Sequence, residues 1–190
     1  MKNVIIFGAS GSLAHVVIAA LKDLRDVRLT LFVRKKSRLH GHDAGGTTVI
    51  EGDAMDAAAV ERAVHGQDIV YVNLAGELEP MVRNIVQAMR KAGAKRIIAI
   101  SSIGIYATPL KSVLKPYRAL ADVVEASGLD YTILRPEWFT DADEVNYTLS
   151  RKGEPEAGSA VSRKSIAAFV ASLVKDPAQH VKDNVGISKP

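Results

Sequence analysis

The chain has 190 residues, no cysteine and a formal net charge of +4 at pH 7. The length suits one domain, and the lack of cysteine excludes disulfides, thiolate metal sites and a cysteine nucleophile. No apolar run is long enough to cross a bilayer, so we expect a cytoplasmic protein without membrane contacts. The basic residues are mostly spread along the chain, which argues against nucleic acid as a partner.

Short β-branched runs alternate with longer amphipathic stretches, which predicts strand–helix–strand units around a parallel sheet. In the first half of the chain, strands are expected at 3–7, 27–33, 47–50 and 69–74. Helices are expected at 12–24, at 56–66 behind an Asp56 cap, and at 80–92 with Gly93 closing the last turn.

The second half continues the same alternation. Strands are expected at 96–101, 131–134 and 185–188, and helices at 116–126 and, behind a Ser162 cap, through 174. No repeat or linker interrupts the pattern. The whole chain, 1–190, is therefore predicted to form one doubly wound α/β domain, with a mostly parallel sheet and helices on both faces. Residues from about 137 onward are expected to cover the substrate.

A glycine-rich turn, Gly8-Ala9-Ser10-Gly11-Ser12-Leu13-Ala14, joins the first predicted strand to the first helix. Gly8 permits a tight turn, Gly11 lets the backbone approach a pyrophosphate, and Ala14 is small enough for close helix–strand packing. The free N–H groups and positive dipole at the helix start would face the phosphates. This context predicts a dinucleotide-binding Rossmann fold, the alternative being a tight turn without a ligand.

The end of the second predicted strand carries Arg34-Lys35-Lys36-Ser37-Arg38 and no carboxylate. An NAD site usually places an acidic side chain here for the ribose 2′-OH, whereas cations attract the 2′-phosphate of NADP. Arg34 could stack on adenine or bind the phosphate, and Lys35, Lys36 or Arg38 could add a second charge. The pattern predicts NADP(H) rather than NAD(H), the alternative being a solvated basic turn.

Two further segments fit cofactor contacts or ordinary turns equally well. Asp53 follows the third predicted strand and could accept a hydrogen bond from the adenine amino group, with Ala54 beside it. Ala75 and Gly76 follow the fourth strand, where the backbone should pass close to the ribose and diphosphate.

These motifs, together with Ser101-Ser102 and the segment Ser-Gly-Leu-Asp-Tyr-Thr-Ile-Leu-Arg-Pro at 127–136, resemble the atypical short-chain dehydrogenase/reductase superfamily. The chain looks most like its small NmrA-like and biliverdin/flavin-reductase-like NAD(P)H-binding proteins. The resemblance implies a nicotinamide near the fifth and sixth strands. It also implies a cofactor lined by Gly8, Ser10, Gly11, Ser12, Leu13, Arg34, Asp53, Ala54, Ala75, Gly76, Ser101 and Pro136.

The chain departs from the superfamily at its usual catalytic pair, a tyrosine with a lysine four residues later. Tyr117 is followed at that spacing by Ala121, and Tyr106 by Leu110. Counting back from 127 puts Tyr117 where the lysine usually stands, with Val113 in the place of the tyrosine. Carbonyl reduction or sugar epimerisation by the standard route is therefore not expected.

Hydride transfer to a flavin, quinone or linear tetrapyrrole needs less acid catalysis, because the acceptor is conjugated and solvent can supply the proton. The segment 136–139, with Tyr106 and Tyr147, could form an aromatic platform, the alternative being ordinary packing. Ser102 and Tyr106 are the candidates for polarising a substrate. Arg135 is expected to pair or cap near the site.

An acidic run, Asp141, Asp143 and Glu144, follows this segment and is interpreted as a solvated loop rather than a metal site. Two functions stay open. The first is an NADP(H)-dependent oxidoreductase acting on a small conjugated acceptor, which we favour. The second is a non-catalytic, NmrA-type NADP(H) sensor that acts through a protein partner. A monomer or loose homodimer is expected.

Overall fold

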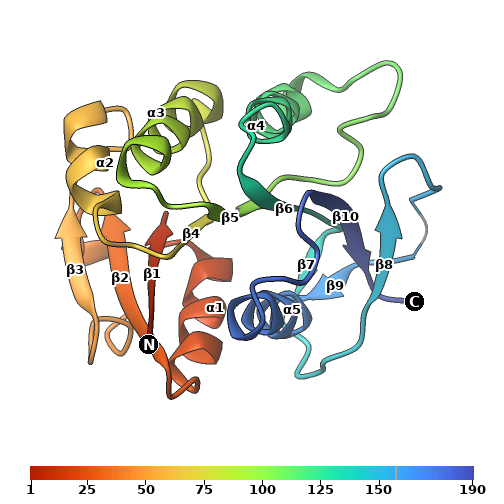
Figure 1. Cartoon of the computed structure of the whole chain (residues 1–190). Coiled ribbons are helices and arrows are strands. Elements are labelled where there is room, and N and C mark those ends of the chain that lie inside the picture. The colour runs from red at the N-terminus through yellow and green to blue at the C-terminus, as the bar shows by residue number, and fades with distance from the viewer. Residues whose placement is uncertain (157) are drawn as a thin grey trace.

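The computed structural model, which describes residues 1–156 and 158–190, has three layers, with helices on both faces of a central sheet (Figure 1). Within the described residues the sheet has eight strands, in the order β3-β2-β1-β4-β5-β6-β10-β8. Their bounds are Lys2–Phe7 (β1), Val27–Val33 (β2), Thr48–Glu51 (β3), Ile69–Val72 (β4), Arg96–Ile100 (β5), Asp130–Pro136 (β6), Thr148–Arg151 (β8) and Asp183–Ser188 (β10).

Neighbouring strands of the sheet run parallel, except that β8 is antiparallel to β10. The order of the first six strands is that of a Rossmann sheet, and the chain changes direction across the sheet between β1 and β4. Ligands of such sheets bind at the carboxyl ends of the strands near this switch point. The predicted doubly wound, mostly parallel α/β fold is confirmed.

Five α-helices cover the sheet in the described part of the chain, with α2, α3 and α4 on one face and α1 and α5 on the other (Figure 1). Their bounds are Ser12–Lys22 (α1), Ala57–Val64 (α2), Leu78–Ala92 (α3), Lys115–Glu125 (α4) and Arg163–Lys175 (α5). The predicted caps are confirmed: Asp56 accepts from the amides of α2, Ser162 from that of Ser165, and Gly93 closes α3 at φ 75°.

Each central strand is buried on both sides, which explains its nearly continuous apolar run. In β1, Val4 and Ile6 pack toward α1 and α5, whereas Ile5 and Phe7 pack toward α2, α3 and α4. The described helices include none that is long and apolar enough to span a membrane.

The C-terminal part contains short elements that the sequence pattern does not predict. Strand β7 (Phe139–Thr140) pairs with β9 (Val161–Ser162) in a separate small sheet, and β8 adds an edge to the main sheet. β8 reads Thr-Leu-Ser-Arg and is half exposed, so it lacks the apolar run that identifies a central strand. Short 3-10 helices also lie at Lys36–Arg38 and Ser112–Leu114.

Candidate functional site

The turns after β1 and β4 touch at the switch point of the sheet. Gly8 has φ +79°, and a Cβ built on it would lie only 2.0 Å from the carbonyl oxygen of Asn73. A Cβ on Gly11 would lie 3.1 Å from the side-chain nitrogen of Asn73. Glycine at these two positions therefore lets the predicted phosphate turn pack directly against the loop that follows β4.

The first turn of α1 is open to an anion. Gly11 stands at the N-cap with an extended backbone, and no side chain of the described residues caps the helix there. The first turn has no acidic residue, so nothing in it opposes the positive end of the helix dipole. Ser10 is half-buried and Ser12 is exposed, whereas Leu13 is buried in the core. Leu13 can therefore contact a cofactor only through its backbone.

The predicted basic turn follows β2 at the same edge of the sheet, and both Arg34 and Lys35 are exposed there. The structure adds one acidic group, because the carboxylate of Glu51 accepts a hydrogen bond from the amide of Lys36 at 2.9 Å. Glu51 ends β3 and pairs in register with Val33 of β2. The sequence alone does not reveal this carboxylate, since the strand order brings it beside the turn.

Asp53 and Ala54 lie beyond the end of β3. One carboxylate oxygen of Asp53 accepts from the amide of Met55 at 2.9 Å, so this side chain stabilises its own turn. Asp53 is nevertheless exposed and keeps a second oxygen. Ala54 is buried, and its carbonyl accepts from Asn84 at 3.0 Å. Ala75 and Gly76, after β4, are exposed, and Gly76 has φ +97°.

The segments after β5 and β6 are joined by backbone hydrogen bonds. The amide of Ser101 donates to Leu134 at 2.7 Å, and that of Ile103 donates to Pro136 at 3.2 Å. Ser102 lies between them, half-buried, and its hydroxyl donates to the carbonyl of Ile103 at 3.1 Å. The predicted residues Ser101, Ser102 and Pro136 are thus brought together at the carboxyl ends of these two strands.

Ser101 and Tyr117 connect this edge to α4. The buried hydroxyl of Ser101 donates to the carbonyl of Tyr117 at 2.9 Å, so a contact of Ser101 with a cofactor would use its backbone. The ring of Tyr117 packs against the core beneath α4. Val113, at the position that the superfamily resemblance compares with the usual tyrosine, is 71% exposed.

Tyr106 belongs to a polar cluster on the α4 side of the sheet. Its hydroxyl accepts from the amide nitrogen of Asn184 at 2.7 Å. The same nitrogen donates to Glu125 at 2.8 Å, and Lys152 binds that carboxylate at 2.8 Å. Asn184 pairs in register with Ile133, below the carboxyl end of β6. The hydroxyl of Tyr106 is therefore held below the strand end, while Ser102 lies at it.

The charges in this cluster support one another. Burial raises the pKa of Glu125, but hydrogen bonds from Lys152 and Asn184 outweigh it and hold that pKa below its ordinary value. The hydrogen bond with Glu125 raises the pKa of Lys152. Cationic groups of Arg118 and Lys152 each lie 4.8 Å from the centre of the Tyr106 ring. The cluster is thus an ionised, mutually stabilised network.

The aromatic residues of the C-terminal part do not gather into one platform. Trp138 is 82% exposed directly beyond the end of β6. The ring of Phe139 lies 5.2 Å from the guanidinium of Arg163. Tyr147 packs against Phe169 in the layer of α1 and α5, on the opposite face of the sheet from Tyr106. Of the aromatic residues proposed for the platform, Trp138 is therefore the most exposed.

The acidic run is held by separate cations. Asp141 binds Arg163 at 2.7 Å, Asp143 binds Lys164, and Glu144 binds Lys189 at 2.8 Å. The described residues include no group of three or more His, Cys, Asp or Glu side chains that could hold a metal ion. These carboxylates tie the loop after β7 to α5 and to the C-terminal end of the chain.

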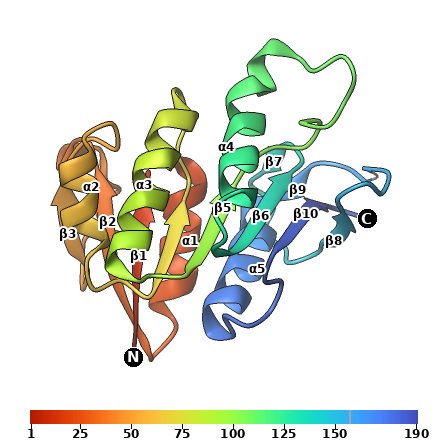
Figure 2. The same cartoon turned by 45° about the horizontal axis from the view of Figure 1, so that its top comes forward.

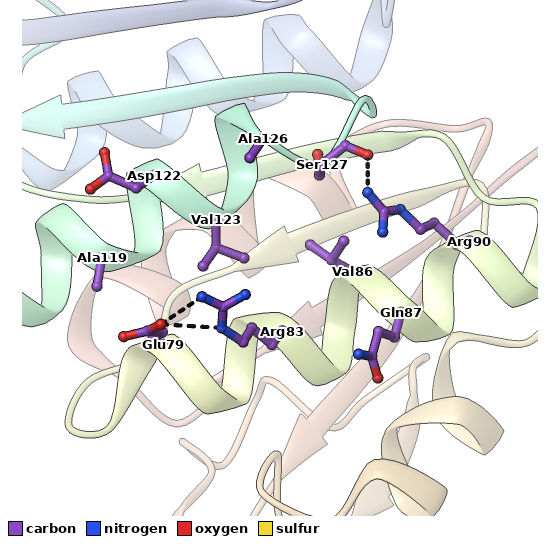
Figure 3. A pocket seen from close by; sticks show the side chains of 10 residues that line it. All are labelled: Glu79, Arg83, Val86, Gln87, Arg90, Ala119, Asp122, Val123, Ala126 and Ser127. Atoms are coloured by element: carbon purple, nitrogen blue, oxygen red, sulfur yellow. Dashed lines mark hydrogen bonds and ion pairs between the residues drawn. The ribbon is translucent and has the colours of Figure 1, made fainter.

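A hollow of about 460 Å³ lies between α3 and α4 (Figure 3). In it Arg83 binds Glu79 at 2.7 Å, and Arg90 donates to the carbonyl of Ser127 at 2.6 Å. Its lining comes from these two helices and the turn after α4, and includes none of the predicted cofactor contacts. The hollow is therefore separate from the strand ends where a dinucleotide would bind.

Comparisons with known proteins agree with this geometry. Residues 8–177 match a protein-family model described as NAD(P)H-binding. Quinone oxidoreductase 2 of Escherichia coli is 31% identical over 160 residues, which are 80% of this chain and 53% of that protein. The chain thus spans about half the length of this relative.

Solved structures extend the likeness to the whole chain. A Rossmann-fold NAD(P)-binding family protein from Shigella flexneri is 42% identical, with a TM-score of 0.92, over 100% of this chain and 94% of the other. A short-chain dehydrogenase/reductase from Veillonella parvula, in complex with NADP, is 26% identical with a TM-score of 0.89, over 100% and 95% of the two chains. The chain therefore belongs to the NAD(P)H-binding family of the atypical, NmrA-like short-chain dehydrogenases/reductases.

Proposed function

We propose that the chain is an NADPH-dependent oxidoreductase that transfers hydride to a small conjugated acceptor such as a quinone or flavin. The observation that carries the proposal lies at the carboxyl ends of β5 and β6. There a half-buried hydroxyl, Ser102, stands beside Pro136, and the exposed indole of Trp138 follows. A flat acceptor could rest against the indole while Ser102 donates to its oxygen.

The cofactor would lie across the switch point, with its diphosphate at the first turn of α1. Bound NADPH would supply the hydride, and this chain's residues would orient it and exclude water. Arg34 and Lys35 would bind the 2′-phosphate, with Asp53, Ala54, Ala75 and Gly76 beside the adenosine and ribose. The NADP held by the Veillonella parvula neighbour supports a cofactor of this class.

A conjugated acceptor suits a site without the usual tyrosine–lysine pair. Hydride addition to a quinone or flavin leaves a delocalised anion, so a weak donor and solvent suffice for the proton. Ser102 is the first proposed donor, and its hydroxyl would turn to the acceptor from the carbonyl of Ile103, to which it donates in the structure. Tyr106 is the second, and its hydroxyl oxygen accepts from Asn184. The name of the Escherichia coli relative, a quinone oxidoreductase, supports this acceptor class.

The chain would act as one domain, 1–190, whose part beyond about 137 covers the acceptor. We propose a cytoplasmic protein, monomeric or loosely dimeric, with a small molecule as its partner.

The test is steady-state oxidation of NADPH with menadione and with riboflavin. We expect turnover by the wild type and a kcat about tenfold lower for Ser102→Ala, since one donor to the reduced acceptor is lost. Tyr106→Phe reports separately on the second donor. Ser112→Ala, an exposed serine in the 3-10 helix before α4, should match the wild type.

One observation favours a second candidate function, a non-catalytic NADP(H) sensor. The position compared with the superfamily's tyrosine is the exposed Val113, and no lysine follows at the usual spacing. The same assay separates the two functions. Tight NADPH binding without oxidation by either acceptor would support the sensor and exclude the proposed oxidoreductase.

A further inference from the structure

Arg135 is an almost completely buried cation whose hydrogen bonds are incomplete. Its side chain is 1% exposed, and burial lowers the pKa of its guanidinium. The Nε atom donates to the side-chain oxygen of Asn184 at 2.8 Å, and Nη1 pairs with the carboxylate of Glu156. Among the described residues, nothing accepts a hydrogen bond from Nη2. The charge of the guanidinium is paired with Glu156, and the N–H groups of Nη2 keep an unused capacity to donate to an acceptor.

A single carboxylate lies between two donors at this point. Glu156 comes from the connection between β8 and β9, and its second oxygen accepts from the amide of Gly104 at 2.8 Å. Gly104 belongs to the segment after β5, whereas Arg135 belongs to β6. An otherwise exposed residue thus places its carboxylate, 23% exposed, against a guanidinium and a backbone amide.

The two donors lie at the edge where the acceptor is proposed to bind. Ile103, next to Gly104, donates its amide to Pro136, next to Arg135. Figure 2 shows the segment after β5 and the β8–β9 connection on the same side of the molecule, at the β10–β8 end of the sheet. Gly104 is therefore close in the chain to Ser102, and Arg135 is close in the chain to Trp138.

Gly186 of β10 lies beside the guanidinium of Arg135 and contributes no side chain there. A Cβ built on Gly186 of β10 would lie 3.8 Å from Nη2 of Arg135 and 2.4 Å from the hydroxyl of Ser150. The 3.8 Å distance is an ordinary van der Waals contact, so a Cβ here would collide with the hydroxyl of Ser150 and leave Arg135 in place. Glycine at this position therefore lets β8 pack closely against β10.

The cluster carries one excess positive charge when Glu156 is left out of the count. Without Glu156, three cations face two carboxylates: Arg118, Arg135 and Lys152 against Asp122 and Glu125. Glu156 balances the excess positive charge. Any carboxylate that reached Arg135 and Gly104 would balance it equally well.

We propose that Arg135 and the amide of Gly104 form a receptor for a carboxylate of the acceptor, and that Glu156 occupies the receptor until the acceptor displaces it. The inference rests on the proposed function and narrows its substrate class to a planar, conjugated acceptor that bears a carboxylate. The ring would lie toward Trp138 and Ser102, and the carboxylate would bind Arg135.

The test is calorimetric titration with 2-naphthoate and its uncharged analogue 2-naphthamide, with and without NADP⁺. Glu156→Gln removes the competing charge, so 2-naphthoate should bind this variant about tenfold more tightly than the wild type. Binding of 2-naphthamide should not change. Glu154→Gln is the matched control, because Glu154 lies in the same connection but accepts from the amide of Arg151 at 2.7 Å.

Equal binding of acid and amide by Glu156→Gln, or equal gains in Glu156→Gln and Glu154→Gln, would overturn the carboxylate receptor. The neutral acceptor menadione separates this inference from the proposed function. NADPH oxidation with menadione but no preference for the acid would overturn the receptor alone. A preference for the acid without oxidation of NADPH would support the receptor and overturn the oxidoreductase.

Discussion

The Nδ1 atom of His15 lies 2.9 Å from the carboxylate of Asp43, and this contact holds the loop after β2 against α1. The side chain of Asp43 is only 4% exposed, and the ring of His40 lies 4.3 Å from that of His15. The basic turn begins the same loop. The position of the proposed 2′-phosphate site therefore depends on a contact made farther along the loop.

Replacing Asp43 with alanine should loosen this loop. Loss of a hydrogen bond to a nearly buried charged group should lower the free energy of unfolding by about 1–3 kcal/mol, measured by urea denaturation. NADPH should also bind more weakly, because the basic turn is less well placed. Asp23→Ala, an exposed change at the end of α1, is the control. Unchanged NADPH affinity in Asp43→Ala would show that the turn holds its position without this contact.

Alanine at Gly8 should abolish cofactor binding, because its Cβ would lie 2.0 Å from the carbonyl oxygen of Asn73. Gly66 provides a matched control, since it has a similar positive φ of +75° but nothing within 4 Å of a built Cβ. Gly66→Ala should cost about 1–2 kcal/mol of stability from backbone strain alone, and Gly8→Ala about 1–3 kcal/mol more from the clash. Urea denaturation and titration with NADPH measure both effects. Equal stability losses would mean that the loop after β4 gives way.

Charge reversal at Arg34 should change cofactor preference. In Arg34→Glu, NADPH should bind about ten- to a hundredfold more weakly, because a charged contact with the 2′-phosphate is lost. NADH, which lacks that phosphate, should bind at least as well as before. Quenching of the single tryptophan, Trp138, follows both titrations, and Arg28→Glu, exposed on the strand that precedes the turn, is the control. Equal losses of affinity for both cofactors would contradict a role for Arg34 in binding the 2′-phosphate. Glu51, whose carboxylate lies beside the turn, would then be the next residue of this region to replace.

The cluster around Tyr106 should stabilise the fold in a pH-dependent manner. The pKa of Glu125 is lower in the folded chain than its ordinary value of about 4.3, so the stabilisation is complete above that pH and is lost as the pH falls through the folded-state value. The difference in unfolding free energy between wild type and Glu125→Gln should be constant near neutral pH and should shrink in acid. Urea denaturation across this range measures it. In a Lys152→Met background the difference should be smaller at neutral pH, and a difference that grows in acid would refute the assignment.

Local physics made much of the fold predictable. The strand predicted at 27–33 matches β2 residue for residue, since most of its residues are apolar and its last five are buried. Asp56, Gly93 and Ser162 are recognisable as caps in the sequence because each acts on atoms within a few residues of itself. The sequence pattern does not predict β8, because an edge strand needs no continuous apolar run.

The sequence by itself determined the doubly wound fold, the phosphate turn and the basic turn, since each depends on neighbouring residues and on hydrophobic periodicity. Only the tertiary structure decided which side chains meet at the strand ends. Strand order put Glu51 beside Lys36, and loop packing brought Tyr106 to Asn184, 78 positions away. The contact of Arg135 with Glu156 arises in the same way. Such contacts have no local signal, because their energies appear only when distant segments pack together.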